Sequence, residues 1–142
     1  MITAVLDTNV ILQAVIGSSR SASARVLDAY FDGKYWLAFS PATTDELLEV
    51  LNLPIMRHRH GWSEDEILRF VLSLHVSAVI GEGREIVSPA ITRDVTDTKF
   101  LSLAAEIGAD FLVTGDRRHL LRLRRFRGTQ IVTAAKFLKE LN

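Results

Sequence analysis

The sequence predicts an α/β fold, a three-layer α/β/α sandwich around a central, mostly parallel sheet of four or five strands. Short apolar runs alternate along the chain with segments of helical periodicity, at lengths that suit β-α-β crossovers, which are almost always right-handed. The runs at residues 2–6 and 110–114 are the most continuously apolar, as expected for central parallel strands buried on both faces. Since the chain has 142 residues, we expect a single domain over residues 1–142.

The N-terminal half is predicted to contain two strands and three helices. In order, these elements are a strand at 2–6, helices at 10–16 and about 22–31, a strand at 35–39 and a helix at 41–51. The first strand stops abruptly at Asp7, and the second helix stops at Gly33. Ser40 followed by Pro41 is typical of a helix start, with an N-cap and a proline at the first helical position.

The C-terminal half repeats the alternation. Its predicted elements are a helix after residue 63, a short strand at 76–80, a small extended piece at 85–87, a polar loop at 88–96, a helix at 97–108, a strand at 110–114, a short helix at 119–123, a strand at 129–132 and a helix at 134–141. Ser63 and Glu66 form a capping-box pattern for the first of these helices. Asp97 and Thr133 are the expected N-caps of two later ones.

The composition excludes several classes of site and location. There is no cysteine, which rules out disulfides, thiolate metal sites and a cysteine nucleophile. No apolar run approaches the ~20 residues of a membrane span, and no charged-then-apolar leader precedes the first strand. We therefore expect a cytoplasmic protein with no membrane partner. Any metal must be held by carboxylates and histidines, and carboxylates favour Mg²⁺ or Mn²⁺.

The basic residues are clustered although the formal net charge is zero. One cluster holds six arginines and His119 without any acid, at positions 117, 118, 122, 124, 125 and 127, and a second lies at residues 57–60. Such clusters are the usual mark of contact with a phosphate backbone. The alternative is a solvated helix face, or pairing with acids such as Asp110 or Glu106.

Four acids recur at equivalent places in the predicted fold. Asp7 ends the first strand, Glu46 lies one to two turns into the helix after the second, Asp97 opens a helix, and Asp116 follows a strand by two residues. Each has an ordinary structural explanation as a cap, a solvated helix residue or a turn acid. In a parallel sheet, however, all four places fall on the carboxyl edge, where ligands bind.

Clustered carboxylates repel one another and raise one another's pKa, so a metal ion is the natural explanation for such a set. A divalent ion held by carboxylates and waters can activate a water molecule and stabilise the charge on a phosphodiester. The four acids therefore indicate nuclease or phosphotransfer chemistry.

The ordered motifs around these acids resemble the PIN domain family, the nuclease domain of VapC-like toxins in toxin–antitoxin pairs. The matching stretches are residues 6–10 (Leu-Asp-Thr-Asn-Val), Ser40-Pro41 with Glu46-Leu47, residues 94–104 and residues 112–117. The resemblance implies a PIN-like nuclease domain with metal-dependent cleavage of single-stranded RNA. It also implies a small antitoxin protein as partner.

By this resemblance, Asp7, Glu46, Asp97 and Asp116 are the catalytic, metal-binding acids, with Mg²⁺ or Mn²⁺ as cofactor. Asn9 would orient the first acid, and Thr114 would supply a hydroxyl near the metal. Asp94 lies three residues before Asp97, so the choice of the third ligand between them stays open. Arg117 and Arg118 directly follow Asp116 and so leave the sheet at the same edge, and with Arg122 and Arg124 they would supply the positive charge that binds RNA.

Two other functions fit the same residues. A catalytically silent PIN-like module would bind RNA or protein and cut nothing. A phosphatase with Asp7 as nucleophile is disfavoured, because such enzymes generally place a second Asp two residues later, where this chain has Asn9. We also expect a two-fold homodimer, since Leu74, Val79 and Ile80, with Trp62 and Phe70 nearby, supply more apolar surface than one small domain easily covers.

Overall fold

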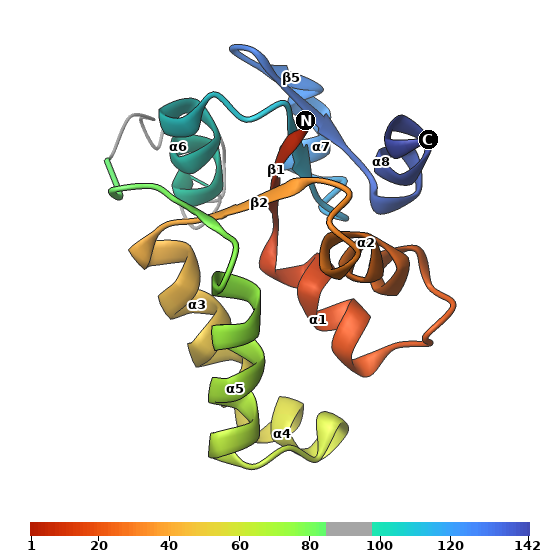
Figure 1. The fold of residues 1–142 in the computed structure, drawn as a ribbon, viewed down its shortest axis with the longest axis vertical. Coiled ribbons are helices and arrows are strands. Elements are labelled where there is room, and N and C mark those ends of the chain that lie inside the picture. The colour runs from red at the N-terminus through yellow and green to blue at the C-terminus, as the bar shows by residue number, and fades with distance from the viewer. Residues whose placement is uncertain (85–97) are drawn as a thin grey trace.

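The computed structural model describes residues 1–84 and 98–142 (Figure 1). The helices and strands are β1 (Thr3–Leu6), α1 (Thr8–Ile16), α2 (Ala22–Phe31), β2 (Trp36–Phe39), α3 (Pro41–Leu51), α4 (Pro54–His60), α5 (Glu64–His75), β3 (Val79–Ile80), α6 (Thr98–Ile107), β4 (Phe111–Val113), α7 (Leu120–Leu123), β5 (Arg125–Phe126), β6 (Thr129–Val132) and α8 (Ala134–Leu141). The predicted extended piece at 85–87, the loop at 88–96 and the helix start at Asp97 lie outside the described residues.

The strands of the described residues form one sheet in the order β3-β2-β1-β4-β6-β5. Every neighbouring pair is parallel except β5 and β6, which are antiparallel. Ala4 of β1 pairs with Leu37 of β2 on one side and with Phe111 of β4 on the other. The chain thus builds outward from β1 in one direction and then returns to add β4 on its other side. In sheets of this kind, the crevice at the carboxyl ends of the two strands at the reversal is the usual ligand site.

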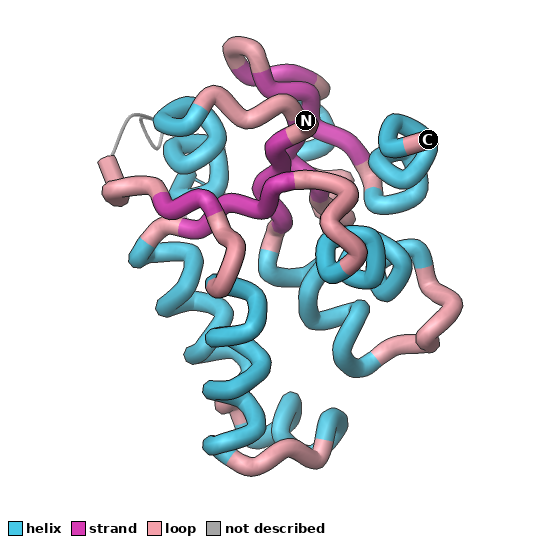
Figure 2. The backbone as a smooth tube through the Cα atoms, in the orientation of Figure 1, coloured by secondary structure: helices cyan, strands magenta, loops and turns pink. Residues whose placement is uncertain are grey.

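Alternate residues of the central strands enter two separate hydrophobic clusters. Leu6 of β1 and Val113 of β4 pack into a cluster with α1, α2, α3, α5 and α8, whereas Val5 and Leu112 pack into a second cluster with α6 and α7. This is the period of two that a strand imposes on its side chains. In Figure 1, α1, α3 and α5 lie below β2 and α6 lies above it, and Figure 2 shows the strands running between these helices. The predicted three-layer α/β/α sandwich is confirmed.

Local sequence signals account for several helix starts. Ser40 accepts a hydrogen bond from the Thr43 amide, and Pro41 occupies the first position of α3. Ser63 and Glu66 form the capping box that their spacing predicts at the start of α5. These caps satisfy backbone amides that have no partner inside a helix, and so they fix where the chain turns away from the sheet.

The structure differs from the sequence prediction at short elements. Residues 54–60, expected as a basic connecting segment, form α4. This helix has no buried residue, so its sequence lacks the apolar periodicity that predicts a helix. The strand expected over 76–80 is reduced to β3, because residues 76 and 77 form a turn at the end of α5, where the Ala78 amide donates to the His75 carbonyl. The hairpin strand β5 was not predicted. Arg124 and Arg127, on either side of it, have positive φ angles, a conformation that the sequence does not signal in non-glycine residues.

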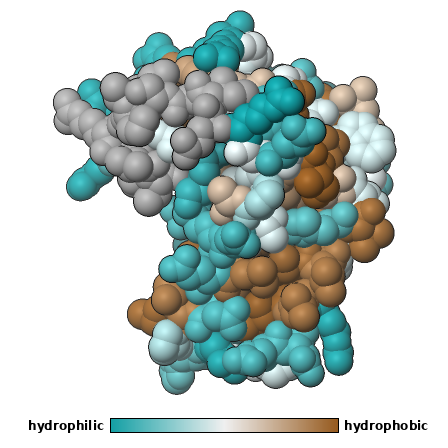
Figure 3. All heavy atoms as spheres, turned by 90° about the vertical axis from the view of Figure 1, so that its left-hand side faces the viewer, coloured by the Kyte–Doolittle hydropathy of each residue, from teal (hydrophilic) through white to brown (hydrophobic). Residues whose placement is uncertain are grey.

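The expectation that Leu74 adds to an exposed apolar surface is wrong. Leu74 is fully buried in the core, on the opposite side of α5 from an exposed stripe formed by Leu68, Leu72 and Val76, which are 48%, 57% and 84% exposed. Their spacing of four residues keeps them on one side of the helix. Ile80, 57% exposed, lies beyond them in sequence. Figure 3 shows a hydrophobic band across the lower half of this face of the molecule.

None of the helices in the described ranges is long and apolar enough to cross a membrane.

Candidate metal and phosphodiester site

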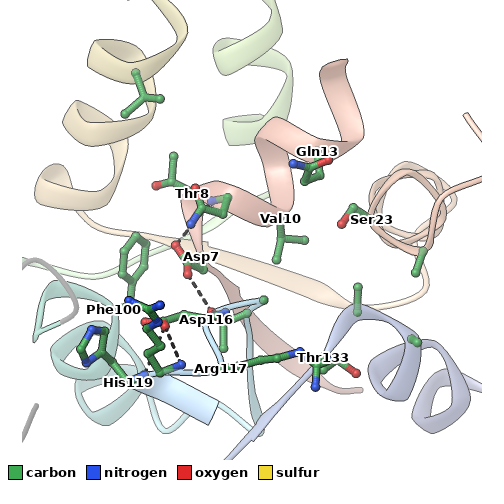
Figure 4. A pocket seen from close by; sticks show the side chains of 18 of the residues that line it. Asp7, Thr8, Val10, Gln13, Ser23, Phe100, Asp116, Arg117, His119 and Thr133 are labelled. Atoms are coloured by element: carbon green, nitrogen blue, oxygen red, sulfur yellow. Dashed lines mark hydrogen bonds between the residues drawn. The ribbon is translucent and has the colours of Figure 1, made fainter. Parts of the chain in front are cut away.

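A cavity of about 880 Å³ opens at the carboxyl ends of β1, β4 and β6. Its lining residues come from the junctions that follow these strands and from the helices around them: Asp7, Thr8, Asn9, Val10, Gln13, Ala22, Ser23, Glu46, Val50, Phe100, Thr114, Gly115, Asp116, Arg117, Arg118, His119, Thr133, Ala134 and Ala135. Figure 4 shows Asp7 and Asp116 in the middle of this pocket, with Gln13 on one side and His119 on the other. The pocket therefore lies at the reversal in strand order, where the fold favours a ligand.

Asp7 is the most deeply placed of the pocket acids, with only 6% of its surface exposed. Its Oδ2 accepts a hydrogen bond of 2.7 Å from the Thr114 hydroxyl, and its Oδ1 accepts a longer one of 3.4 Å from the Asn9 amide. The second contact makes Asp7 the N-cap of α1, so the capping explanation is geometrically correct. It does not account for the burial of a carboxylate next to other acids.

The pKa of the Asp7 carboxyl is raised above its ordinary value, chiefly by burial. The negative charges of Glu46 and Asp116 add to the increase, while the hydrogen bonds from Thr114 and Asn9 oppose it. The folded protein therefore disfavours the ionised form of Asp7 relative to its protonated form. A positive charge in the pocket would offset this effect.

Glu46 reaches the same pocket from the second turn of α3. Its Oε2 accepts a short hydrogen bond from the Thr8 hydroxyl, and its Oε1 lies 3.0 Å from the Lys99 ammonium on α6. Both oxygens are thus engaged by partners from two other parts of the chain. These contacts hold Glu46 near Asp7, because Thr8 directly follows Asp7 in sequence.

Asp116 lies three residues after Val113, the last residue of β4, and shapes the turn that follows. Its Oδ1 accepts hydrogen bonds from the Arg118 and His119 amides, at 3.1 and 3.2 Å. Its own amide donates to the Thr114 hydroxyl oxygen at 3.0 Å. Thr114, which is fully buried, therefore links Asp7 to Asp116 through one hydroxyl group.

The third acidic position lies outside the described residues, for both Asp94 and Asp97. The described start of α6 nevertheless adjoins the pocket, since Phe100 lines it and Lys99 contacts Glu46. Within residues 1–84 and 98–142, no three acids or histidines are close enough together to form a metal-binding cluster. The donors that line the pocket are carboxylate and hydroxyl oxygens, which are the kind that Mg²⁺ and Mn²⁺ prefer.

The four arginines proposed to contact RNA divide into two pairs. Arg117 and Arg118 line the pocket, whereas Arg122 on α7 and Arg124 after it do not. None of the four forms an ion pair with an acid in the described ranges. The two acids suggested as their partners have other contacts. Asp110 accepts from the Thr3 amide, and Glu106 accepts from three consecutive backbone amides at residues 82–84.

Sequence reasoning missed two residues that contact the pocket acids. Thr8 belongs to the opening motif but was not assigned a role, and Lys99 lies two residues after Asp97, within the third acidic motif. Their contacts with Glu46 depend on the packing of α3 against α1 and α6, which no local pattern reports. Asn9, expected to orient Asp7, contacts it through its backbone amide.

The comparisons with known proteins agree with this geometry. The chain has the fold of VapBC2 from Rickettsia felis, solved bound to a DNA fragment from their promoter, with a TM-score of 0.58, 14% identity, and coverage of 93% of this chain and 98% of that one. It also has the fold of PAE2754 from Pyrobaculum aerophilum, with a TM-score of 0.58, 16% identity, and coverage of 99% and 89%. No curated protein matches the sequence.

At these low identities the two solved structures establish the fold alone. The sequence itself carries the family assignment. The PIN domain profile matches residues 3–118, a stretch that runs from β1 through Asp7, Glu46 and Asp116 and so includes every acid described in the pocket. The chain belongs to the PIN domain family.

Proposed function

We propose that the protein is a metal-dependent endoribonuclease that cleaves single-stranded RNA. PIN domains are generally nucleases. The observation that carries the proposal is the pocket at the reversal in strand order. Asp7, Glu46 and Asp116 line this pocket together with Arg117 and Arg118. Carboxylates suit a hard cation and arginines suit phosphates, so the pocket combines the two requirements of phosphodiester cleavage.

Asp7, Glu46 and Asp116, together with Asp97 or Asp94, would hold Mg²⁺ or Mn²⁺. When bound, such an ion lowers the pKa of a coordinated water and stabilises negative charge on the phosphate. The protein supplies the rest. Thr114 orients one oxygen of Asp7, and among the described residues the other oxygen accepts only the long contact from the Asn9 amide.

Arg117 and Arg118 act on the substrate and not on the acids. A carboxylate cluster repels the nucleotides on either side of the cleaved bond, and a bound cation offsets this only where it sits. Both arginines line the pocket and pair with no described acid, so their guanidinium groups are available to flanking phosphates. Arg122 and Arg124 would contact RNA farther from the cleaved bond.

The activity is tested by incubating the protein with a labelled single-stranded RNA in MnCl₂, MgCl₂ or EDTA. We expect shortened RNA only with a metal ion, and none from the Asp7→Asn or Glu46→Gln variants. Glu49→Gln is the matched control, because Glu49 is exposed on the same helix and lies outside the pocket. Full metal-dependent cleavage by Asp7→Asn would leave Asp7 as a helix cap only.

The second candidate function is a catalytically silent RNA- or protein-binding module. The arginines that favour RNA binding would serve it equally well. The two functions give different results on the same RNA, since a binding module would retard it on a native gel without shortening it in any metal.

The fold shared with VapBC2 supports a role as the toxin of a toxin–antitoxin pair, with a small antitoxin as partner. A small reading frame with a DNA-binding pattern beside this gene, whose product co-purifies with the protein and inhibits cleavage, is the expected result.

The protein would act as a two-fold homodimer. The support is the exposed stripe of Leu68 and Leu72 on α5 and Val76 at its C-cap, because exposed apolar patches commonly mark interfaces. A two-fold axis would place this stripe against its own copy.

A further inference from the structure

A positively charged side chain contacts one acid of the proposed metal site. The Lys99 ammonium lies 3.0 Å from Oε1 of Glu46, and the two side chains are only 27% and 19% exposed. It forms the single ion pair found between a described side chain and an acid of the pocket. Lys99 comes from the first turn of α6 and Glu46 from the second turn of α3, so the contact spans two layers of the sandwich.

The contact engages the part of Glu46 that a metal ion needs. The other carboxylate oxygen, Oε2, already accepts the Thr8 hydroxyl. A divalent ion coordinated by Glu46 would therefore share Oε1 with the ammonium or displace the hydroxyl. Two cations on one carboxylate repel each other, and this repulsion is strong where water is partly excluded.

Lysine is suited to a reversible role at this position. Its charge is a compact ammonium on a flexible four-carbon stem, so it can withdraw to solvent by rotation about its own bonds. Lys99 is already about one quarter exposed, which leaves a path outward. Arg117 and Arg118 line the pocket without pairing to a described acid, so they do not duplicate this contact.

We propose that Lys99 is a tethered counter-ion of Glu46 in the metal-free protein, which Mg²⁺ or Mn²⁺ must displace from the carboxylate in order to bind. Lys99 thereby sets the metal concentration at which the site fills. The role rests on the proposed metal-dependent function, and it makes Lys99 a positioning residue. The opposite role, in which Lys99 orients Glu46 toward the metal, predicts an effect of opposite sign.

The test is calorimetric titration of the protein with MnCl₂ in the absence of RNA, for the wild type, Lys99→Met and Lys34→Met. Methionine keeps the apolar stem and removes the charge. Lys34→Met is the matched control, since it makes the same change in net charge at a loop residue outside the pocket. We expect Lys99→Met to bind Mn²⁺ about two- to fivefold more tightly, the range for loss of a partly exposed ion pair. Lys34→Met should match the wild type.

A second measurement separates competition from a loss of folding. In EDTA, Lys99→Met should unfold at a lower temperature than the wild type, because Glu46 has lost its counter-ion. In saturating MnCl₂ that difference should vanish or reverse. Lys99→Arg, which keeps the charge, should restore the metal-free stability.

Equal or weaker Mn²⁺ binding by Lys99→Met, with normal binding by the wild type, would overturn the proposal while leaving the nuclease function intact. Absence of Mn²⁺ binding in the wild type and in Lys99→Met alike would overturn the metal-dependent function and the role of Lys99 with it.

Discussion

Replacing Thr114 with valine tests whether one buried hydroxyl keeps the first acid of the site charged. Valine has nearly the same shape, so the change removes the hydroxyl without opening a cavity. Two hydrogen bonds are lost, the one donated to Asp7 Oδ2 at 2.7 Å and the one accepted from the Asp116 amide at 3.0 Å. Thr114 is fully buried, so no water can take its place without rearrangement.

The expected cost follows from these two contacts. A hydrogen bond to a charged group contributes about 1.5–3 kcal/mol, and an amide left without a partner costs about 1–3 kcal/mol when buried. The Asp116 amide is only partly buried, so its share is small, and we expect Thr114→Val to lower the free energy of unfolding by roughly 2–4 kcal/mol in all. For a domain of this size, that corresponds to a fall in Tm of roughly 5–15 °C.

The assay is urea unfolding followed by circular dichroism in EDTA, with Thr114→Ser as control. Serine keeps both hydrogen bonds and loses one buried methyl group, which costs only about 1 kcal/mol. The Thr114 hydrogen bond favours ionised Asp7 and so lowers its pKa relative to the valine variant. The stability that this hydrogen bond contributes is therefore present while Asp7 is ionised, and it is lost as the pH falls through the Asp7 pKa. Equal stabilities of the valine and serine variants at neutral pH would refute the reasoning.

Three further predictions use other parts of the structure. Replacing Arg117 and Arg118 with alanine should flatten the slope of log RNA affinity against log salt by about one to two units, measured by fluorescence anisotropy, and an unchanged slope would assign both arginines to structure. Leu72→Asp should convert a dimer to a monomer in light scattering, because it places a charge within the α5 stripe; a wild type that is monomeric at micromolar concentration contradicts the dimer. Backbone hydrogen bonds from Arg84, Glu82 and Gly83 lower the pKa of Glu106, so this acid stabilises the fold above its unfolded pKa near 4.5, and that contribution is lost as the pH falls through the lowered value. Glu106→Gln should therefore lower Tm at neutral pH by an amount that disappears in acid. A Tm difference between wild type and variant that stays constant across this pH range would contradict a stabilising role for the ionised Glu106 carboxylate.

The sequence predicts those parts of the fold whose signal is local. The continuous apolar runs of β1 and β4 predict strands that are buried on both faces. Ser40 and Pro41 predict the start of α3 from the chemistry of these two residues alone. The hairpin strand β5 has two residues, too few for any periodicity, and it depends on positive φ angles at Arg124 and Arg127. The helical spacing of Leu74 with Ile67 and Val71 places it on the inner face of α5, and the structure buries all three.

The candidate site divides in the same way. Asp7 and Asp116 could be placed from sequence because each directly follows a strand, and strand ends meet at one edge of a parallel sheet. Their hydroxyl partner Thr114 follows from the same rule. The ion pair between Glu46 and Lys99 could not be predicted, because it depends on how far apart α3 and α6 are packed and on the rotamers of two long side chains.

The position of β1 in the sheet has a consequence for how the protein is made. β1 leaves the ribosome well before its neighbour β4, which begins at Phe111, and the hydrogen bond between Thr114 and Asp7 joins residues 107 positions apart. Because pairing over such a separation must wait for the intervening chain, the pocket cannot close on a nascent N-terminal fragment. At a synthesis rate of about 5–20 residues per second, Asp7 has no Thr114 partner for several seconds after it is made. Truncated products that end before β4 would carry Asp7 and Glu46 but have no assembled pocket, so they would be inert.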